Sequence, residues 1–388
     1  MSSFQQSLLP ELPVAHLIIA LDNGGLEHLV MRWTAYRNKK APGSTHIICL
    51  DKPGSLASQF HESPVHCIEA NRSRFPWDEQ AVKRLSKLLK KLNITVLHSH
   101  NSAAQLYGIL ATRKNGIAHL QTQHGMDLHG RGIKGTLRNR IMGFFTQQYA
   151  AVSAEVANNV CTNHGVSPNK VHFVANGVEE HHSTPSQKLQ ELRQTLKIPK
   201  HAFVLGSVGR LATVKGWDLF LPIFAKLIET SSIKRPLHLL LVGDGPERNH
   251  LQSVVKDLRI EKNMSLAGFQ KDCHPYYDLI DLFIMPSRSE GLSVALLEAM
   301  QAGCPVAVTA VGEHTKLVEV SCGGILLTPE KPESWLGVLS TFINNTNELK
   351  SCALRGKEHI KLHYTLENTY HNYEALYQHL FDSTCTKH

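Results

Sequence analysis

The chain has 388 residues, of which 42% are hydrophobic and 19% charged, the composition of a globular protein long enough for two domains. Lys and Arg outnumber Asp and Glu by 41 to 33, and the resulting net charge of +8 suits an anionic small molecule or a membrane surface. Aromatic residues make up only 7% and are not interleaved with basic ones, so we expect no nucleic-acid partner.

The first residues give no indication of secretion. MSSFQQSLLPELP has no positive charge ahead of the apolar run VAHLIIAL, which is too short to span a membrane. The eight cysteines are scattered without a Cys-x-x-Cys pair, and several lie in apolar runs such as HIICL. Reduced, buried thiols are a better interpretation than a disulfide framework, so we expect a cytoplasmic protein.

Short apolar runs alternate with helix-length segments through the first half of the chain. Residues 81–92 carry Leu85, Leu88, Leu89 and Leu92 at the spacing of an amphipathic helix. Strands separated by helices predict βαβ units and a parallel sheet. The expected strands are 14–21, 45–50, 65–70, 94–100, 117–123, 148–153 and 171–176.

The alternation stops in the polar stretch 177–200, which predicts a linker with a short helix, and then begins again. The second set of expected strands is 203–209, 237–245, 264–268, 282–287, 305–310 and 323–328. The pattern predicts an α/β protein with two tandem Rossmann-like, doubly wound domains and a ligand cleft between them. The expected parts are a first domain (1–178), a linker (179–200), a second domain (201–364) and a terminal helix (365–388) that crosses back to the first domain.

Loops after the second set of strands carry charged residues and glycines. Arg210 and Lys215 follow strand 203–209 at a strand–helix corner, where two cations and a helix N-terminus can hold a diphosphate. A solvated surface pair is the alternative for any isolated Arg and Lys. Gly243 permits a tight turn after the next strand, at the edge of the same expected crevice.

Two glutamates, Glu290 and Glu298, lie in the stretch SRSEGLSVALLEAMQAGCPV with seven residues between them. We expect a mostly apolar helix to begin near Leu292. Glu298, two turns in, then needs hydrogen-bond donors, which a ribose diol or a core Arg or Lys would supply. The joint placement of Glu290 and the free N–H groups of Gly291, Leu292 and Ser293 at the helix start favours a ligand over a salt bridge.

Four segments of the second half resemble, in order and spacing, the nucleotide-sugar half of retaining glycosyltransferases of family 4, which have the GT-B architecture. The segments are GRLATVKGWDLF, LVGDGPER, LAGFQKD and the glutamate stretch. The resemblance covers most of 200–330 strongly and the first domain more weakly. It implies that Arg210 and Lys215 neutralise the donor diphosphate as it leaves. It also implies that Glu298 binds the ribose and that Glu290, beside the Gly291–Ser293 backbone, binds the transferred sugar.

The resemblance implies further donor contacts. Gly268 and Phe269 would face the base, and Gly24 and Gly25 would approach the donor phosphates, although any tight strand–helix turn would also use a glycine pair. His124, after strand 117–123, matches the position of an active-site histidine, with a packed or capping histidine as the alternative.

His98-x-His100 is a possible metal-binding pattern. We interpret its two side chains as pointing to opposite faces of their strand, and a chance pair is expected among 24 histidines, so we predict no metal site. No Asp-x-Asp occurs in the chain, so the usual signature of metal-dependent diphosphate binding is also missing.

A basic stretch contains Arg131, Lys134, Arg138 and Arg140, and no acid occurs from Leu128 to Ala154. It is either a solvated helix face or a seat for an anionic lipid-linked acceptor or the inner membrane surface.

We therefore expect an enzyme without a cofactor that transfers a hexose-type sugar. Its donor would be a UDP- or GDP-linked sugar, and its acceptor a glycan or lipid-linked oligosaccharide of the cell-surface polysaccharide or lipopolysaccharide type. A sugar-nucleotide epimerase of the same architecture and a non-catalytic sugar-nucleotide-binding protein are the alternatives.

Overall fold

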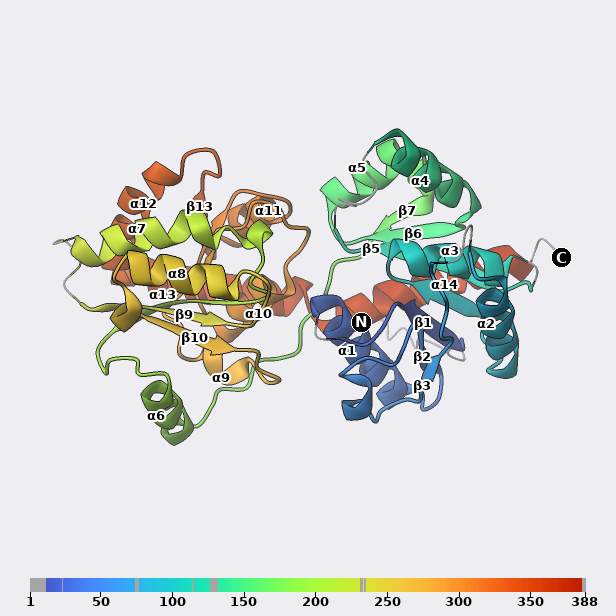
Figure 1. Cartoon of the computed structure of the whole chain (residues 1–388), viewed down its shortest axis with the longest axis horizontal. Coiled ribbons are helices and arrows are strands. Elements are labelled where there is room, and N and C mark those ends of the chain that lie inside the picture. Colours follow the sequence, from blue (N-terminus) through green and yellow to red (C-terminus); the bar gives the residue numbers. More distant parts are fainter. Residues whose placement is uncertain are drawn as a thin grey trace, which may run out of the picture. The chain divides into compact units, whose positions relative to one another are not determined.

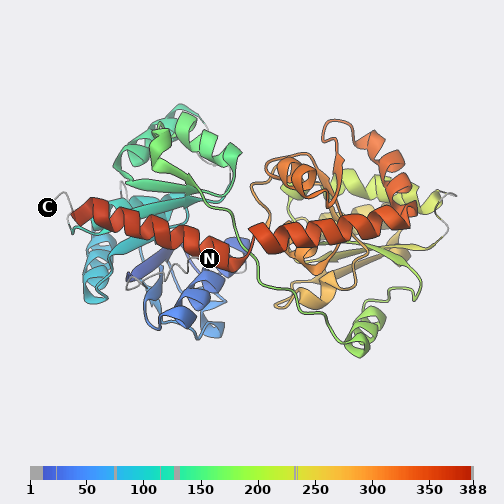
Figure 2. The same cartoon turned by 180° about the vertical axis from the view of Figure 1, so that it is seen from behind.

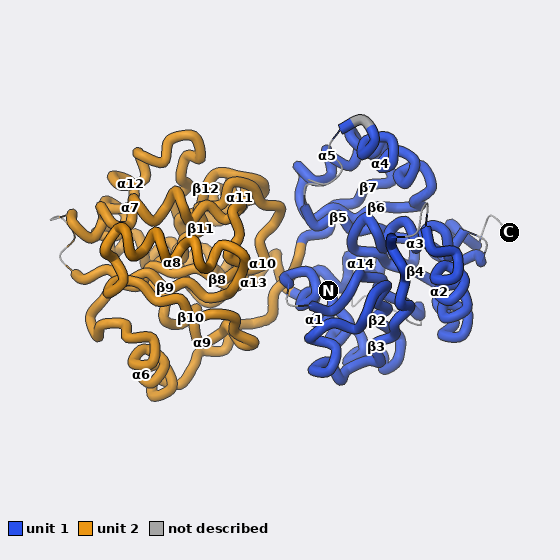
Figure 3. Tube along the Cα trace, viewed as in Figure 1, with its two compact units in different colours: residues 1–175, 366–388 blue, residues 176–365 orange. Residues whose placement is uncertain are grey.

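The computed structural model describes residues 12–22, 24–73, 77–113, 115–125, 132–230, 233 and 235–385. The chain forms two compact units, unit 1 from residues 1–175 and 366–388 and unit 2 from residues 176–365 (Figure 3). The first boundary lies three residues before the expected one, and the stretch expected to be a linker belongs to unit 2. The terminal segment from 366 onward belongs to unit 1.

Unit 1 contains a parallel sheet in the order β3-β2-β1-β4-β5-β6-β7 (Figure 1). Its strands are β1 (Val14–Ile18), β2 (Thr45–Cys49), β3 (Val65–Cys67), β4 (Val96–Ser99), β5 (Ala118–Gln123), β6 (Gln148–Ala151) and β7 (Val171–Phe173). Its helices are α1 (Gly25–Lys40), α2 (Glu79–Lys91), α3 (Ser102–Thr112), α4 (Ile133–Phe145), α5 (Ala154–Asn163) and α14 (Leu366–Cys385), with short 3-10 turns at Ala57–Gln59 and Pro168–Lys170.

Unit 2 repeats this arrangement with the order β10-β9-β8-β11-β12-β13, again parallel. Its strands are β8 (Phe203–Val208), β9 (Leu237–Val242), β10 (Met264–Gly268), β11 (Leu282–Met285), β12 (Val306–Thr309) and β13 (Gly324–Leu327). Its helices are α6 (Ser186–Thr195), α7 (Trp217–Glu229), α8 (Arg248–Asp257), α9 (His274–Tyr277), α10 (Val294–Ala302), α11 (His314–Ser321), α12 (Trp335–Asn344) and α13 (Thr346–His363). Short 3-10 turns lie at Thr213–Lys215, Glu261–Asn263 and Pro332–Ser334.

These sheets confirm the predicted fold class of two Rossmann-like domains. Each expected strand is present, 264–268 at its full expected length and the others in shortened form. Central strands such as β4, β8 and β9 are buried along their whole length, because helices cover both faces of a parallel sheet. The amphipathic segment 81–92 forms most of α2. Asp78 caps this helix by accepting hydrogen bonds from the N–H groups of Gln80 and Ala81.

Helix α14 completes unit 1 although it follows unit 2 in the chain (Figure 2). Arg37, in α1, is 3% exposed and donates to both carboxylate oxygens of Glu374 in α14, at 2.6 and 3.1 Å. It also donates to the carbonyls of Leu12 and Ser44 and to the hydroxyl of Thr45. A charge this deeply buried is tolerated because each of its donor groups has a partner.

Among the helices within the described ranges, none combines the length and apolar character needed to cross a bilayer.

We predict that Arg37→Met destabilises unit 1 by about 3–5 kcal/mol, because the change leaves Glu374 and two carbonyl groups without their buried donor. Arg72→Met is the matched control, since Arg72 pairs with Asp51 at 2.7 Å but both side chains are about a third or more exposed. The control should cost less than about 1 kcal/mol. Denaturant unfolding of both variants measures the difference, and equal losses would contradict the role given to Arg37.

Candidate active site

The predicted donor residues of unit 2 gather where its strands end. The strand order reverses between β8 and β11, and ligands of doubly wound folds bind outside the carboxyl ends of the strands at such a point. Lys215 follows β8 and Glu290 follows β11, so they reach this position from its two sides.

Glycines let the turns after β8, β9 and β10 approach closely. Gly209 donates to the carbonyl of Val242 at 2.9 Å, and Gly243 donates to that of Gly268 at 2.8 Å. Gly243 has φ +131°, and a Cβ at this position would lie 2.0 Å from the carbonyl oxygen of Gly209. A glycine is therefore required at 243, which brings the β8 and β9 turns to one edge.

Lys215 and Glu290 form an ion pair. The Lys215 Nζ donates to Glu290 Oε1 at 2.6 Å, and the Ser287 hydroxyl donates to the same oxygen at 2.7 Å. Burial by itself would raise the pKa of Glu290, but the Lys215 charge and these hydrogen bonds outweigh burial and hold that pKa below its usual value. The salt bridge that we disfavoured from the sequence is thus present for Glu290.

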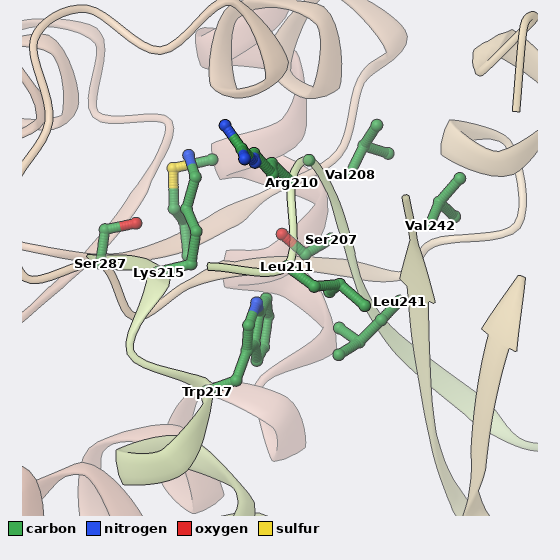
Figure 4. Close-up of a pocket in the computed structure, with 11 residues that line it drawn as sticks. Ser207, Val208, Arg210, Leu211, Lys215, Trp217, Leu241, Val242 and Ser287 are labelled. Atoms are coloured by element: carbon green, nitrogen blue, oxygen red, sulfur yellow. The ribbon is translucent and has the colours of Figure 1, made fainter. Parts of the chain in front are cut away.

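Lys215 and Ser287 also line a small pocket with Arg210 (Figure 4). The other lining residues are Ser207, Val208, Gly209, Leu211, Trp217, Leu241, Val242 and Met285. Arg210 is exposed, and its guanidinium forms no ion pair with any carboxylate in the described part of the chain. The pocket therefore has an apolar floor and two cationic side chains.

Helix α10 begins at Val294, two residues later than expected, with Ser293 as its N-cap. Within the described ranges, the N–H groups of Gly291, Leu292 and Ser293 donate no backbone hydrogen bond. Gly312 has φ +54° and lies against this segment, where a Cβ would be 2.0 Å from the carbonyl oxygen of Glu290. The close contact fixes the backbone immediately after Glu290.

Glu298 lies two turns into the helix region and is half-buried, not fully enclosed. Its Oε2 accepts a hydrogen bond from the Tyr277 hydroxyl at 2.8 Å. A hydroxyl group therefore already contacts this carboxylate, the kind of partner that we expected a ribose to supply. Gly268 adopts φ +71°, and the neighbouring Phe269 is 44% exposed.

The remaining predicted residues belong to unit 1. Gly24 precedes α1 and has an extended backbone. Gly25 is the first residue of that helix, and a Cβ at this position would meet no described atom within 4 Å. His124 follows β5 and contacts His100, with its Nε2 3.0 Å from His100 Nδ1. Of the basic stretch, Arg131 lies outside the described residues, and Lys134, Arg138 and Arg140 are exposed on α4.

His98 and His100 do not point to opposite faces of their strand, so that prediction was wrong. Residues two apart on a strand share a face, and the two ring centroids are 4.1 Å apart. His16, paired with His98 in the β1–β4 register, joins them, and single nitrogens of all three rings lie within 4.8 Å of one another.

Sequence reasoning missed Ser287, Tyr277 and His16 as partners of the predicted residues. Ser287 could have been found, because it is three residues before Glu290 in the same loop. Tyr277 is separated from Glu298 by 21 residues and His16 from His100 by 84, so these contacts depend on the tertiary structure.

Two protein families match the chain. Residues 24–182 match the family described as Glycosyltransferase Family 4, and residues 189–359 match Glycosyl transferases group 1. The matches divide at the polar stretch 183–188, so the first covers strands β2 to β7 and the second covers strands β8 to β13.

Curated relatives are similar over most of the chain. An Escherichia coli UDP-Gal:alpha-D-GlcNAc-diphosphoundecaprenol alpha-1,3-galactosyltransferase is 25% identical over 68% of this chain and 70% of its own length. The N-acetyl-alpha-D-glucosaminyl L-malate synthase of Bacillus anthracis is 25% identical over 86% of this chain and 88% of its own.

Solved structures share the fold. Anabaena Alr3699/HepE in complex with UDP superposes with a TM-score of 0.79 at 17% identity, over 93% of this chain and 98% of that one. WaaG, a glycosyltransferase involved in lipopolysaccharide biosynthesis, gives a TM-score of 0.68 at 15% identity, over 90% of this chain and 95% of its own.

Proposed function

Because the chain belongs to the glycosyltransferases of the family 4 and group 1 kinds, we propose that it is a retaining enzyme that moves a hexose-type sugar from a nucleoside diphosphate to a lipid-linked or glycan acceptor. The observation that carries the proposal is the Lys215–Glu290 ion pair at the strand-order reversal of unit 2, with Arg210 lining the same pocket.

The chemistry requires stabilisation of the charge that builds on the leaving diphosphate. Lys215 and Arg210 supply fixed cations, and the N–H groups of Gly291, Leu292 and Ser293 would supply further donors immediately after Glu290. Such preorganised groups stabilise a developing anion more effectively in a partly dry site than water does. The acceptor hydroxyl would then attack from the side on which the diphosphate leaves, with a donor phosphate oxygen taking its proton.

The two glutamates would bind different parts of the donor. Glu290 is ionised and held by Lys215 and Ser287, so it can accept hydrogen bonds from hydroxyl groups of the transferred sugar. Glu298 accepts from Tyr277 through one oxygen, and a ribose hydroxyl would add to that contact. Gly24, Gly25 and His124 of unit 1 would contact the phosphates and the sugar.

A UDP-linked sugar is the donor that we propose to test first, and a GDP-linked sugar second. The Escherichia coli relative is named for UDP-Gal, and HepE was solved with UDP-glucose. We propose that no metal is required, because Asp-x-Asp is missing from the sequence and two cations already line the pocket.

The surface of α4 supports the proposal of a lipid-linked acceptor. Leu137, Ile141 and Phe144 are 60%, 51% and 77% exposed, and Phe145 is 38% exposed. The cations of α4 flank these apolar side chains, and the sequence from 128 to 154 contains no acid. An exposed face that is both apolar and basic suits an anionic membrane surface. We propose that α4 binds the cytoplasmic face of the membrane, where a lipid-linked acceptor is presented.

We predict that the protein releases UDP from a UDP-hexose only when acceptor is present, and that release continues in EDTA. Mass spectrometry of products from a panel of UDP- and GDP-sugars with diphosphoprenol-linked saccharides measures this. Lys215→Met should lower turnover about 10²–10³-fold, and Lys256→Met, on the exposed face of α8, should not. Epimerised donor without acceptor, or loss of transfer in EDTA that Mg²⁺ restores, would refute the proposal.

The two glutamates are predicted to fail differently. Glu298→Gln should weaken binding of free nucleoside diphosphate by about 1–3 kcal/mol, because it removes charged hydrogen bonds to the ribose. Glu290→Gln should leave that binding nearly unchanged and depress transfer, because its partner is the sugar. Calorimetry with UDP or GDP separates the two effects, and equal weakening in both variants would end the assignment.

Membrane binding is predicted to depend on the apolar residues of α4. Ile141→Ser with Phe144→Ser should reduce binding to phosphatidylglycerol vesicles by roughly a hundredfold, since each buried side chain contributes about 1.5–3 kcal/mol. Leu362→Ser, which removes a 68% exposed leucine from α13 in unit 2, is the control. Vesicle flotation measures both, and wild-type flotation of the double variant would exclude α4.

A further inference from the structure

Three histidines of unit 1 are joined head to tail by hydrogen bonds. His124 Nε2 lies 3.0 Å from His100 Nδ1, and His100 Nε2 lies 2.9 Å from His16 Nδ1. The three residues come from different strands, because His16 is in β1, His100 follows β4 and His124 follows β5. We call this set the histidine chain.

The histidine chain is enclosed by aromatic and polar side chains. The Trp33 ring lies 6.0–6.4 Å from each of the three imidazoles, measured between ring centroids, and is only 7% exposed. His98 lies against His16 and His100, and its own nitrogens contact the hydroxyls of Tyr377 and Thr122 at 2.8 and 2.6 Å. Water is therefore kept from the link between His16 and His100.

A metal ion is the other interpretation of His16, His98 and His100, and the distances disfavour it. Two histidine nitrogens that bind one zinc at about 2.0–2.1 Å lie about 3.3 Å apart in tetrahedral geometry, farther than the His16–His100 separation. Both nitrogens of His98 already contact hydroxyls. The charge of the buried Arg37 guanidinium acts on His16 and would oppose a cation there.

The hydrogen-bond rules of imidazole allow only two proton arrangements in the chain. A neutral ring has one N–H and one acceptor nitrogen. If His100 carries its proton on Nδ1, it donates to His124 Nε2 and must accept from His16 Nδ1. Each ring then carries its proton on Nδ1. In the other arrangement each ring carries its proton on Nε2. A mixed arrangement loses one of the two hydrogen bonds.

We propose that the histidine chain sets the tautomer of His124 collectively, so that His100 and His16 are positioning residues for the active site. In one arrangement His124 offers an N–H donor at Nδ1, and in the other an acceptor. The histidine chain uses Nε2 of His124, so Nδ1 is the nitrogen of this ring that would contact a ligand. The catalytic consequence rests on the role of His124 in the proposed function.

Neutral rings are favoured by the surroundings of the chain. Burial, with smaller contributions from Arg37 and His124, lowers the pKa of His16 to about 3, and burial lowers that of His124 to about 3. Within the described residues, the charged and titratable groups that line the cavity beside His16 or contact the three histidines come from three elements. They are Tyr36 and Arg37 from α1, Tyr370, Tyr373, Glu374 and Tyr377 from α14, and His98 from β4.

At its His16 end, the histidine chain can exchange a proton with water. His16 lines a cavity of about 20 Å³ with Trp33, Arg37, Tyr373, Glu374 and Tyr377. This volume is sufficient for one water molecule. A change of arrangement takes up one proton at His16 Nε2, releases one at His124 Nδ1 and moves one proton within each link, so the net charge stays the same.

The test is long-range ¹H–¹⁵N NMR of the full chain labelled with ¹⁵N-histidine, which identifies the protonated nitrogen of each ring. We expect His16, His100 and His124 to share one tautomer in the wild type. His16→Leu should change or mix the tautomer of His124, although the two side chains share no hydrogen bond, and should lower turnover roughly tenfold or more with little change in donor KM. His16→Asn, which keeps a polar group near the Nδ1 position, should restore the tautomer, and it replaces His16→Leu if that variant does not fold.

His238→Asn is the control, because His238 is a buried histidine of unit 2 whose Nε2 lies 2.8 Å from the Ser265 hydroxyl, outside the chain. It should leave the His124 signals unchanged. Different tautomers in the three wild-type rings would overturn the proposal, as would unchanged His124 signals in a folded His16→Leu protein. Stoichiometric metal in the purified protein would also overturn it. If the three histidines share one tautomer but the protein transfers no sugar, the proposed coupling of the histidine chain is confirmed and only the proposed function is refuted.

Discussion

Parallel pairing sends the carboxyl ends of neighbouring strands to the same edge of a sheet, and both units depend on this constraint. In unit 2 it brings the loops after β8 and β11 together, so that Lys215 meets Glu290 across 75 residues of sequence. In unit 1 it brings His100 and His124 together after β4 and β5. Helices cover both faces of such a sheet, which is why central strands such as β4, β8 and β9 are buried along their whole length.

The fold could be predicted because strands and helices of this architecture have recognisable local sequence patterns. A strand covered on both faces is a short apolar run, and the helix between two such runs shows the 3.6-residue period that Leu85, Leu88 and Leu89 display. Strand lengths were overestimated where the run continued into the loop, as at His100, which lies one residue beyond β4. The sequence does not mark this strand end, because His100 is buried like the residues of β4 before it.

The site was less accessible to sequence reasoning, since partners are chosen by three-dimensional position. The charged residues themselves could be singled out, and their proposed roles stay predictions. That Glu290 would pair with Lys215, or that Tyr277 would already contact Glu298, could not be inferred from residues so far apart. The histidine pair was misjudged for a different reason, because the strand period was applied to it incorrectly.

Unit 1 is discontinuous in the chain, since it is left at residue 175 and resumed at 366. A ribosome therefore delivers every residue of unit 2 before it delivers α14, and unit 2 can fold while unit 1 still lacks the helix that partners Arg37 and His98. Until then the apolar face that Leu376, Tyr377 and Leu380 cover is unprotected, and the guanidinium of Arg37 lacks its counter-ion. The newly made protein is consequently most exposed to chaperones and proteases at the stage of synthesis shortly before this helix is added.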